Sequence, residues 1–299
     1  MESIKNFILE ALNAPENLKM IKKWFKDHKG DRLKLTGDTI YVTGKSGAVH
    51  NSITFLPGET ELPDYINIEP KEYTASLDIF GNDLTTFKGI PMPGPGAYLN
   101  VFDCNNLEDF DTDISKNTSL GSITFKNCKK LKSFSALDTL KTRFSYFYLH
   151  DCPNLSSLKD FYNKNIVISK IENCGLDSLE GFPLIEVSSV RGPVIEVHGC
   201  SRLKSLDIVG KKTPSDIIIT DCKNLSEVGN CSWPKDGETN RYDFNGCSNV
   251  DENFFEKIYD MSSHTSGWAT INLKGTKVKE DSEIIKRIKS EIPEVKIYF

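Results

Sequence analysis

The chain has 299 residues, with 42 acidic and 37 basic side chains and a formal net charge of −5 at pH 7. This balance argues against a protein that binds nucleic acid or an anionic membrane through bulk positive charge. No apolar stretch approaches the roughly 20 residues that a membrane-spanning helix needs. The first ten residues mix charged and apolar side chains, unlike a secretory signal. We therefore expect a cytoplasmic protein whose eight cysteines stay reduced.

The N-terminal 75 residues are expected to form a cap of helices and short strands. Pro15 suits the first turn of a helix, and Leu18, Ile21 and Phe25 would share one face of it. The expected elements are two helices at 4–12 and 15–28, a β-hairpin at 32–43, and short strands at 53–55 and 66–68.

Seven of the eight cysteines recur at a near-constant spacing, which indicates an internal repeat. The intervals between them are 24, 24, 22, 26, 22 and 25 residues. The flanking pattern extends to Asn82 upstream and Thr276 downstream, so the repeat occurs nine times. The repeated cysteines are Cys104, Cys128, Cys152, Cys174, Cys200, Cys222 and Cys247.

Each repeated position is preceded by two apolar residues, five and three places before it. Of the eighteen residues at these places only Ser169 is polar, whereas a 38% apolar composition predicts about seven apolar residues. A period of two is that of a strand with one buried face. Gly, Asp or Asn stands directly before every repeated position, and these residue types turn a chain sharply. A leucine or valine follows two or three residues after it.

This order of strand, turn and leucine resembles the leucine-rich repeat family, in the form that carries cysteine at the turn. Residues 148–158 carry the match clearly, and the resemblance covers about residues 76–278 in irregular repeats of mostly 22–26 residues. It implies an α/β, β-rich solenoid with a parallel sheet on its concave side. Because the outer halves of the repeats show no steady helical period, we expect an irregular convex side of loops and short turns.

The C-terminal end is expected to close the solenoid, because end repeats would otherwise expose their apolar edges. A helix is predicted at 252–261, and an amphipathic helix at 281–291 precedes a strand at 295–299. The expected organisation is one elongated domain: a cap at 1–75, a solenoid at 76–278 and a cap at 279–299.

Residue types that often carry chemistry form no recognised site. The repeated cysteines lack the short Cys-x-x-Cys pairs of a zinc site, and the family buries a small residue at this position. Cys231 is off the period and is the best candidate for an accessible thiol. Gly44-Lys45-Ser46 lacks the upstream glycine of a phosphate-binding loop. We therefore expect no enzyme activity, no metal and no cofactor.

The five histidines lie near no recognised nucleophile motif. Where a histidine stands two residues before a repeated cysteine, the alternation of the strand should turn it outward while the cysteine turns inward. We expect all five on the surface: His28, His50, His150, His198 and His264.

The same alternation places a second set of side chains on the exposed concave face. Taken two, four and six residues before each repeated position, they include five acids and four bases, so no basic stripe suits a phosphate backbone. Aromatic residues gather in the first four repeats, as at many interaction sites. The alternative is that the N-terminal cap buries Phe80 and Phe102. The predicted partner-binding residues are Phe80, Tyr98, Phe102, Lys126, Tyr146, Tyr148, His150, Lys170 and Glu172.

These features favour a protein-binding module without catalytic activity. The resemblance implies that the concave face holds a partner protein, and we expect an intracellular inhibitor or adaptor of bacterial or bacteriophage origin acting on a host protein. Two alternatives stay open. One is an enzyme whose activity lies in the caps, and the other is a secreted or cell-surface adhesin.

Overall fold

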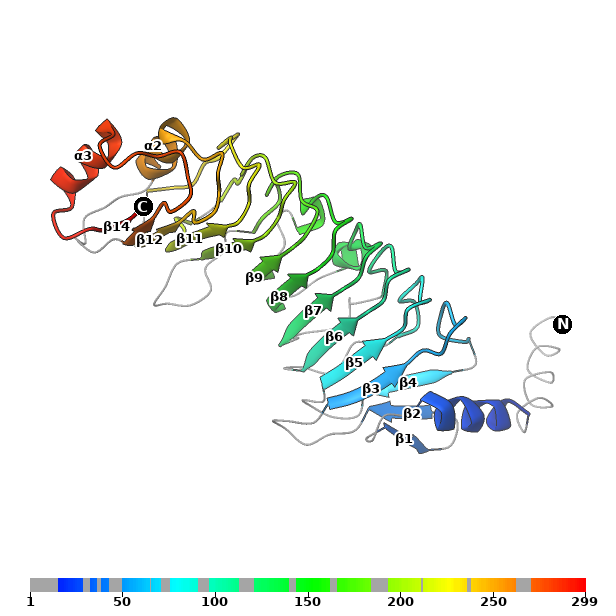
Figure 1. Ribbon diagram of the computed structural model, residues 1–299. Coiled ribbons are helices and arrows are strands. Elements are labelled where there is room, and N and C mark those ends of the chain that lie inside the picture. Colours follow the sequence, from blue (N-terminus) through cyan, green and yellow to red (C-terminus); the bar gives the residue numbers. More distant parts are fainter. Residues whose placement is uncertain are drawn as a thin grey trace.

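A parallel sheet of eleven strands runs through most of the protein (Figure 1). The structure is a computed structural model. It describes residues 16–28, 33–36, 39–42, 50–64, 66–70, 76–90, 97–112, 121–139, 144–161, 166–183, 193–210, 212–235, 238–261 and 270–299.

The strands of this sheet follow one another in chain order, so each turn of the chain lays its strand beside the strand of the previous turn. In Figure 1 the strands line the inside of a curved solenoid, and loops line its outside. The predicted parallel sheet on the concave side is therefore confirmed. The strands are β3 (His50–Thr54), β5 (Ser76–Phe80), β6 (Tyr98–Phe102), β7 (Ser122–Lys126), β8 (Phe144–His150), β9 (Ile166–Glu172), β10 (Val194–His198), β11 (Asp216–Thr220), β12 (Arg241–Asp243), β13 (Thr270–Asn272) and β14 (Lys296–Tyr298).

A smaller sheet stands at the N-terminal end. Its strands β1 (Leu33–Thr36) and β2 (Thr39–Val42) form the predicted antiparallel hairpin, and β2 pairs in parallel with β4 (Asn67–Pro70). A helix over residues 16–28 lies beside this sheet (Figure 1). It corresponds to the second predicted helix, whereas the helix predicted at 4–12 lies outside the described residues.

Two strands outside the predicted repeats also join the long sheet. β3 pairs in parallel with β5, and β14 pairs in parallel with β13. The other helices within the described residues are α2 (Glu252–Asp260) and α3 (Glu283–Glu291), close to their predicted bounds, and the short 3-10 helices η1 (Ser135–Thr139) and η2 (Lys159–Phe161). None of the described helices has the length and apolar character that crossing a bilayer requires.

The alternating apolar residues fill the interior of the solenoid, as their period predicts. Each of them is at most 1% exposed, and the leucines and valines after the turns are buried with them. The side chain of Ser169 lies outside the described residues. The buried strand residues are Leu77, Ile79, Leu99, Val101, Ile123, Phe125, Phe147, Leu149, Ile171, Ile195, Val197, Ile217, Ile219, Tyr242, Phe244, Ile271 and Leu273.

The sharp turn after most of the strands depends on a left-handed backbone conformation, which Gly, Asn and Asp adopt more readily than other residues. Gly81, the predicted turn residue after β5, is the exception, because its φ is not positive. Asn127 has a φ of 57° and Asn173 a φ of 51°. Their amides donate to the aspartates of the preceding turns, and Asn173 Nδ2 lies 2.9 Å from Asp151 Oδ1. The predicted turn residues with positive φ are Asp103, Asn127, Asp151, Asn173, Gly199, Asp221, Gly246 and Gly275.

Candidate functional site on the concave face

Strand pairing sets the predicted partner-binding residues in rows across β5 to β9. All nine side chains lie on the concave face, and none of them is buried. Their role in binding stays a prediction. One row contains Phe80, Phe102, Lys126, His150 and Glu172, the next sets Tyr148 beside Lys170, and the third has Tyr98 and Tyr146 on either side of Ser122.

The aromatic side chains on this face are open to solvent to different degrees. Tyr98 is 51% exposed and Tyr146 is 41% exposed. Phe80 and Phe102 are half-buried, and their ring centroids lie 5.3 Å apart. Neither phenylalanine is buried, so the described residues of the N-terminal segment do not cover them as the alternative required. The result is an accessible aromatic surface over β5 to β8.

Beyond the aromatic residues, the charged side chains of β8 to β10 pair with one another. Glu172 accepts from Lys170 Nζ at Oε1 and forms an ion pair with His150 Nδ1 at Oε2. Lys170 Nζ is 3.9 Å from Glu196 Oε1, and His198 Nε2 is 3.1 Å from the same oxygen. The face therefore neutralises most of its own charge here, whereas Lys126, nearer the aromatic residues, is exposed.

The sequence predicted the row of each of these residues correctly, but it did not indicate which of the side chains pair. Lys170 and Glu172 lie on the same strand but in different rows, and Glu172 contacts both Lys170 and His150. The row of a residue gives its neighbours on the adjacent strands, whereas side-chain rotamers decide which of these neighbours form a bond.

This pairing changes the ionisation of both partners. Burial alone would raise the pKa of the Glu172 carboxyl, but the hydrogen bond from Lys170 and the charges of His150 and Lys170 outweigh burial and lower it. The hydrogen bond to Glu172 in turn raises the pKa of Lys170. The charged forms of both groups are thus stabilised in the folded protein.

Glu172→Gln is expected to lower the free energy of unfolding at pH 7 by about 0.5–1 kcal/mol, because the pair is partly exposed. A carboxyl with a lowered folded pKa stabilises the protein above its unfolded pKa, and this contribution disappears as the pH falls through the folded pKa. The difference from the wild type should therefore shrink as the pH falls below the usual carboxyl range, and it should vanish once Glu172 is protonated in the folded protein too. Urea unfolding at several pH values measures it. A difference that persists at low pH, or that the exposed Glu227→Gln also produces, would contradict the prediction.

The seven repeated cysteines are buried and free, as predicted. Cys152 Sγ donates to His150 O over 3.3 Å, and Cys174 Sγ to Glu172 O over 3.3 Å. Cys231 is the most accessible of the eight thiols, although burial raises its pKa to about 11. Within the described ranges no three His, Cys, Asp or Glu side chains are placed to hold a metal ion.

Thiol labelling is expected to be slow in the native protein, because the thiolate is the reactive species and burial disfavours it. With a chromogenic disulfide reagent at neutral pH, at most one of the eight thiols should react within minutes, and all eight should react in denaturant. Cys231→Ser should remove any fast phase. Rapid native labelling of several thiols would show that the repeated cysteines are not buried in solution.

One histidine departs from the surface location expected for all five. His28 is only 4% exposed, because its ring stacks on that of Trp24 at 4.1 Å and Glu59 covers its Nε2. Glu59 is 31 residues away in the chain, so no local spacing indicated this contact. His150 and His198 are half-buried on the concave face. His264 and the side chain of His50 lie outside the described residues.

Comparison with known proteins adds no assignment. No family model, no curated protein and no solved structure matches the chain. A function therefore rests on the geometry of the surfaces described above.

Proposed function

We propose that this protein is a non-catalytic binding module that holds a partner protein on the concave face of a cysteine-bearing leucine-rich repeat solenoid. The repeat spacing, the buried alternating residues and the left-handed turns support this type of repeat. Residues 1–75 and 279–299 would serve as its caps. The specific role we propose is that of an intracellular inhibitor or adaptor, of bacterial or bacteriophage origin, acting on a host protein.

The observation that carries the proposal is the accessible aromatic surface over β5 to β8. Tyr98 and Tyr146 stand in one row, and the rings of Phe80 and Phe102 contact each other at a tilt in another. Tyrosine and phenylalanine bury a large area for few rotatable bonds, and residues of this kind dominate protein interfaces. An exposed aromatic group of this kind on a rigid sheet is a binding surface that needs no rearrangement.

The charged pairs of β8 to β10 would form the polar edge of this interface. His150, Lys170 and Glu172 already hold one another, so their side chains lose little further freedom when a partner binds. Lys126 is exposed among the aromatic residues and would favour a partner with an acidic group opposite it.

The proposal is tested by affinity capture from a lysate of the native host with two variants of matched size. The first is Tyr146→Ala/Tyr148→Ala/His150→Ala, within the proposed interface. The control is Asn245→Ala/Asn272→Ala/Lys274→Ala, at the other end of the same face. Both variants must give the circular dichroism and unfolding midpoint expected of a folded protein.

A stoichiometric partner that the wild type and the control retain, and that the first variant loses, would support the proposal. The affinity for the isolated partner should then fall by at least about a hundredfold, as at other aromatic hot spots. A partner retained equally by both variants, or the absence of any partner, would overturn it.

A further inference from the structure

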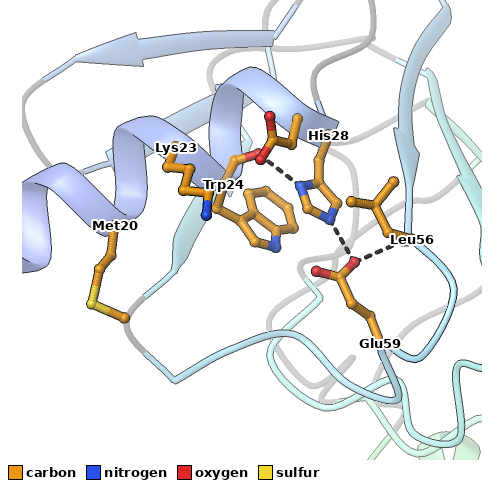
Figure 2. Close-up of a pocket in the computed structure, with 7 residues that line it drawn as sticks. Met20, Lys23, Trp24, His28, Leu56 and Glu59 are labelled. Carbon is orange, nitrogen blue, oxygen red and sulfur yellow. Dashed lines mark hydrogen bonds and ion pairs between the residues drawn. The ribbon is translucent and has the colours of Figure 1, made fainter.

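A small hollow at the N-terminal end lies outside the proposed partner interface. It has a volume of about 340 Å³ and lies between the helix over residues 16–28 and the loop after β3 (Figure 2). The helix contributes Met20, Trp24 and His28, and the loop contributes Leu56 and Glu59. This volume is within the range of small-molecule sites and about ten times the share of one water in the liquid.

His28 fixes the position of the Glu59 carboxylate. His28 Nδ1 lies 2.7 Å from the carbonyl oxygen of Trp24, which can only accept, so Nδ1 carries a proton. His28 Nε2 lies 2.5 Å from Glu59 Oε2, a contact that also requires a proton between the two atoms. The backbone N–H of Leu56 donates to the same oxygen over 2.7 Å. Glu59 is thus held through Oε2.

Two polar atoms remain at this hollow without a hydrogen-bond partner among the described residues. One is Trp24 Nε1, a donor on a side chain that is only 5% exposed. The other is Glu59 Oε1, since the hydrogen bonds recorded within the described ranges all use Oε2. Figure 2 shows the indole nitrogen on the side of the ring that faces Glu59. A buried donor without an acceptor is rare in native proteins and indicates a missing water or ligand.

We propose that this hollow binds a small planar amide attached to an apolar ring. The carbonyl oxygen of the amide would accept from Trp24 Nε1, and its N–H would donate to Glu59 Oε1. Met20 and Leu56 would contact the ring. A primary carboxamide carries a donor and an acceptor on one edge, which matches the two unused atoms.

Other small polar groups match this hollow less well. Lys23 and Asp27 also line the hollow with opposite charges. A carboxylate would place its charge against Glu59 and would offer no donor to Glu59 Oε1. A primary amine could pair with Glu59 but would leave the indole N–H without an acceptor. The amide is the class that satisfies both atoms without burying a net charge.

The test uses the full-length ¹⁵N-labelled protein, with benzamide as the probe. The chain has three tryptophans, so the spectrum should contain three indole N–H signals. Trp24→Phe identifies the signal of Trp24, and Trp233→Phe with Trp268→Phe identifies it by elimination if Trp24→Phe does not fold. We expect benzamide to shift the Trp24 signal saturably and to leave that of Trp233 in place.

Benzoate, benzylamine and two variants complete the test. Benzoate and benzylamine should bind about tenfold more weakly than benzamide, as should benzamide to Glu59→Gln. Benzoate has no donor for Glu59 Oε1, benzylamine has no acceptor for Trp24 Nε1, and Glu59→Gln removes the charge of the acceptor. Lys22→Gln, an exposed residue of the same helix that does not line the hollow, should leave the affinity unchanged. The proposal is overturned if benzamide leaves the Trp24 signal unmoved, which would mean that water alone fills the hollow. Equal binding of all three probes, or full affinity in Glu59→Gln, would also overturn it.

Discussion

Phe147→Ala is expected to lower the free energy of unfolding by about 3–5 kcal/mol, the usual cost of emptying a large buried aromatic site. Phe147 on β8 is fully buried, and its ring contacts those of Phe134, Phe161 and Phe125 at centroid distances of 5.3, 5.0 and 5.9 Å. Two of these contacts are edge-to-face, the arrangement that adds to simple area burial. Phe125 and Phe134 belong to the repeat of Cys128, and Phe161 to that of Phe147 itself, so the side chain joins two neighbouring turns near the middle of the solenoid.

Tyr146→Ala is the matched control, since Tyr146 is the neighbouring residue on the same strand and points outward. It should cost about 0.5 kcal/mol or less. Denaturant unfolding followed by circular dichroism measures both variants. Because a solenoid is stabilised mainly between neighbouring turns, Phe147→Ala can also split the transition into two steps. Equal midpoints for the two variants would show that the predicted register of β8 is wrong.

The sequence predicted the solenoid because its repeated signals are local and mutually consistent. Alternation in the strands gives the buried face, and Asn or Asp before the cysteine gives the left-handed turn, as Asn127 and Asp151 illustrate. Each signal was weak in one repeat and strong over nine. The rows of the concave face followed from the same alignment on the repeated positions, so the sequence could assign Tyr98 and Tyr146 to one face.

What the sequence did not predict depends on contacts between distant segments. β3 lacks the turn residue and the repeated cysteine, so its alternation around Ile53 did not assign it to the long sheet. His28 is buried because Trp24 and Glu59 cover it, and Glu59 belongs to a loop 31 residues away. A single histidine on a helix gives no signal of such a contact.

Gly175→Ala is the second substitution with a large expected effect. Gly175 follows Cys174 in a repeat whose leucine comes one residue earlier than usual, and this shortening draws its backbone against the previous turn. A Cβ at Gly175 would come 1.8 Å from the carbonyl oxygen of Pro153 and 2.7 Å from its carbonyl carbon. Both are backbone atoms, and Gly175 N also donates to Cys152 O over 3.2 Å. Neither backbone segment can therefore move away without weakening this hydrogen bond. The expected cost is about 3 kcal/mol, the upper part of the range for overpacking.

Gly275→Ala separates this clash from backbone strain. Gly275 has a φ of +77°, which disfavours alanine, but a Cβ there would meet no atom closer than 3.5 Å. Strain alone should therefore cost about 1–2 kcal/mol. Gly175 needs no left-handed conformation, so its larger loss would come from the close approach of two turns. Urea midpoints of the two variants, measured together, decide the comparison. If Gly275→Ala lost more stability than Gly175→Ala, the turns around residue 175 would be further apart in solution than the structure places them.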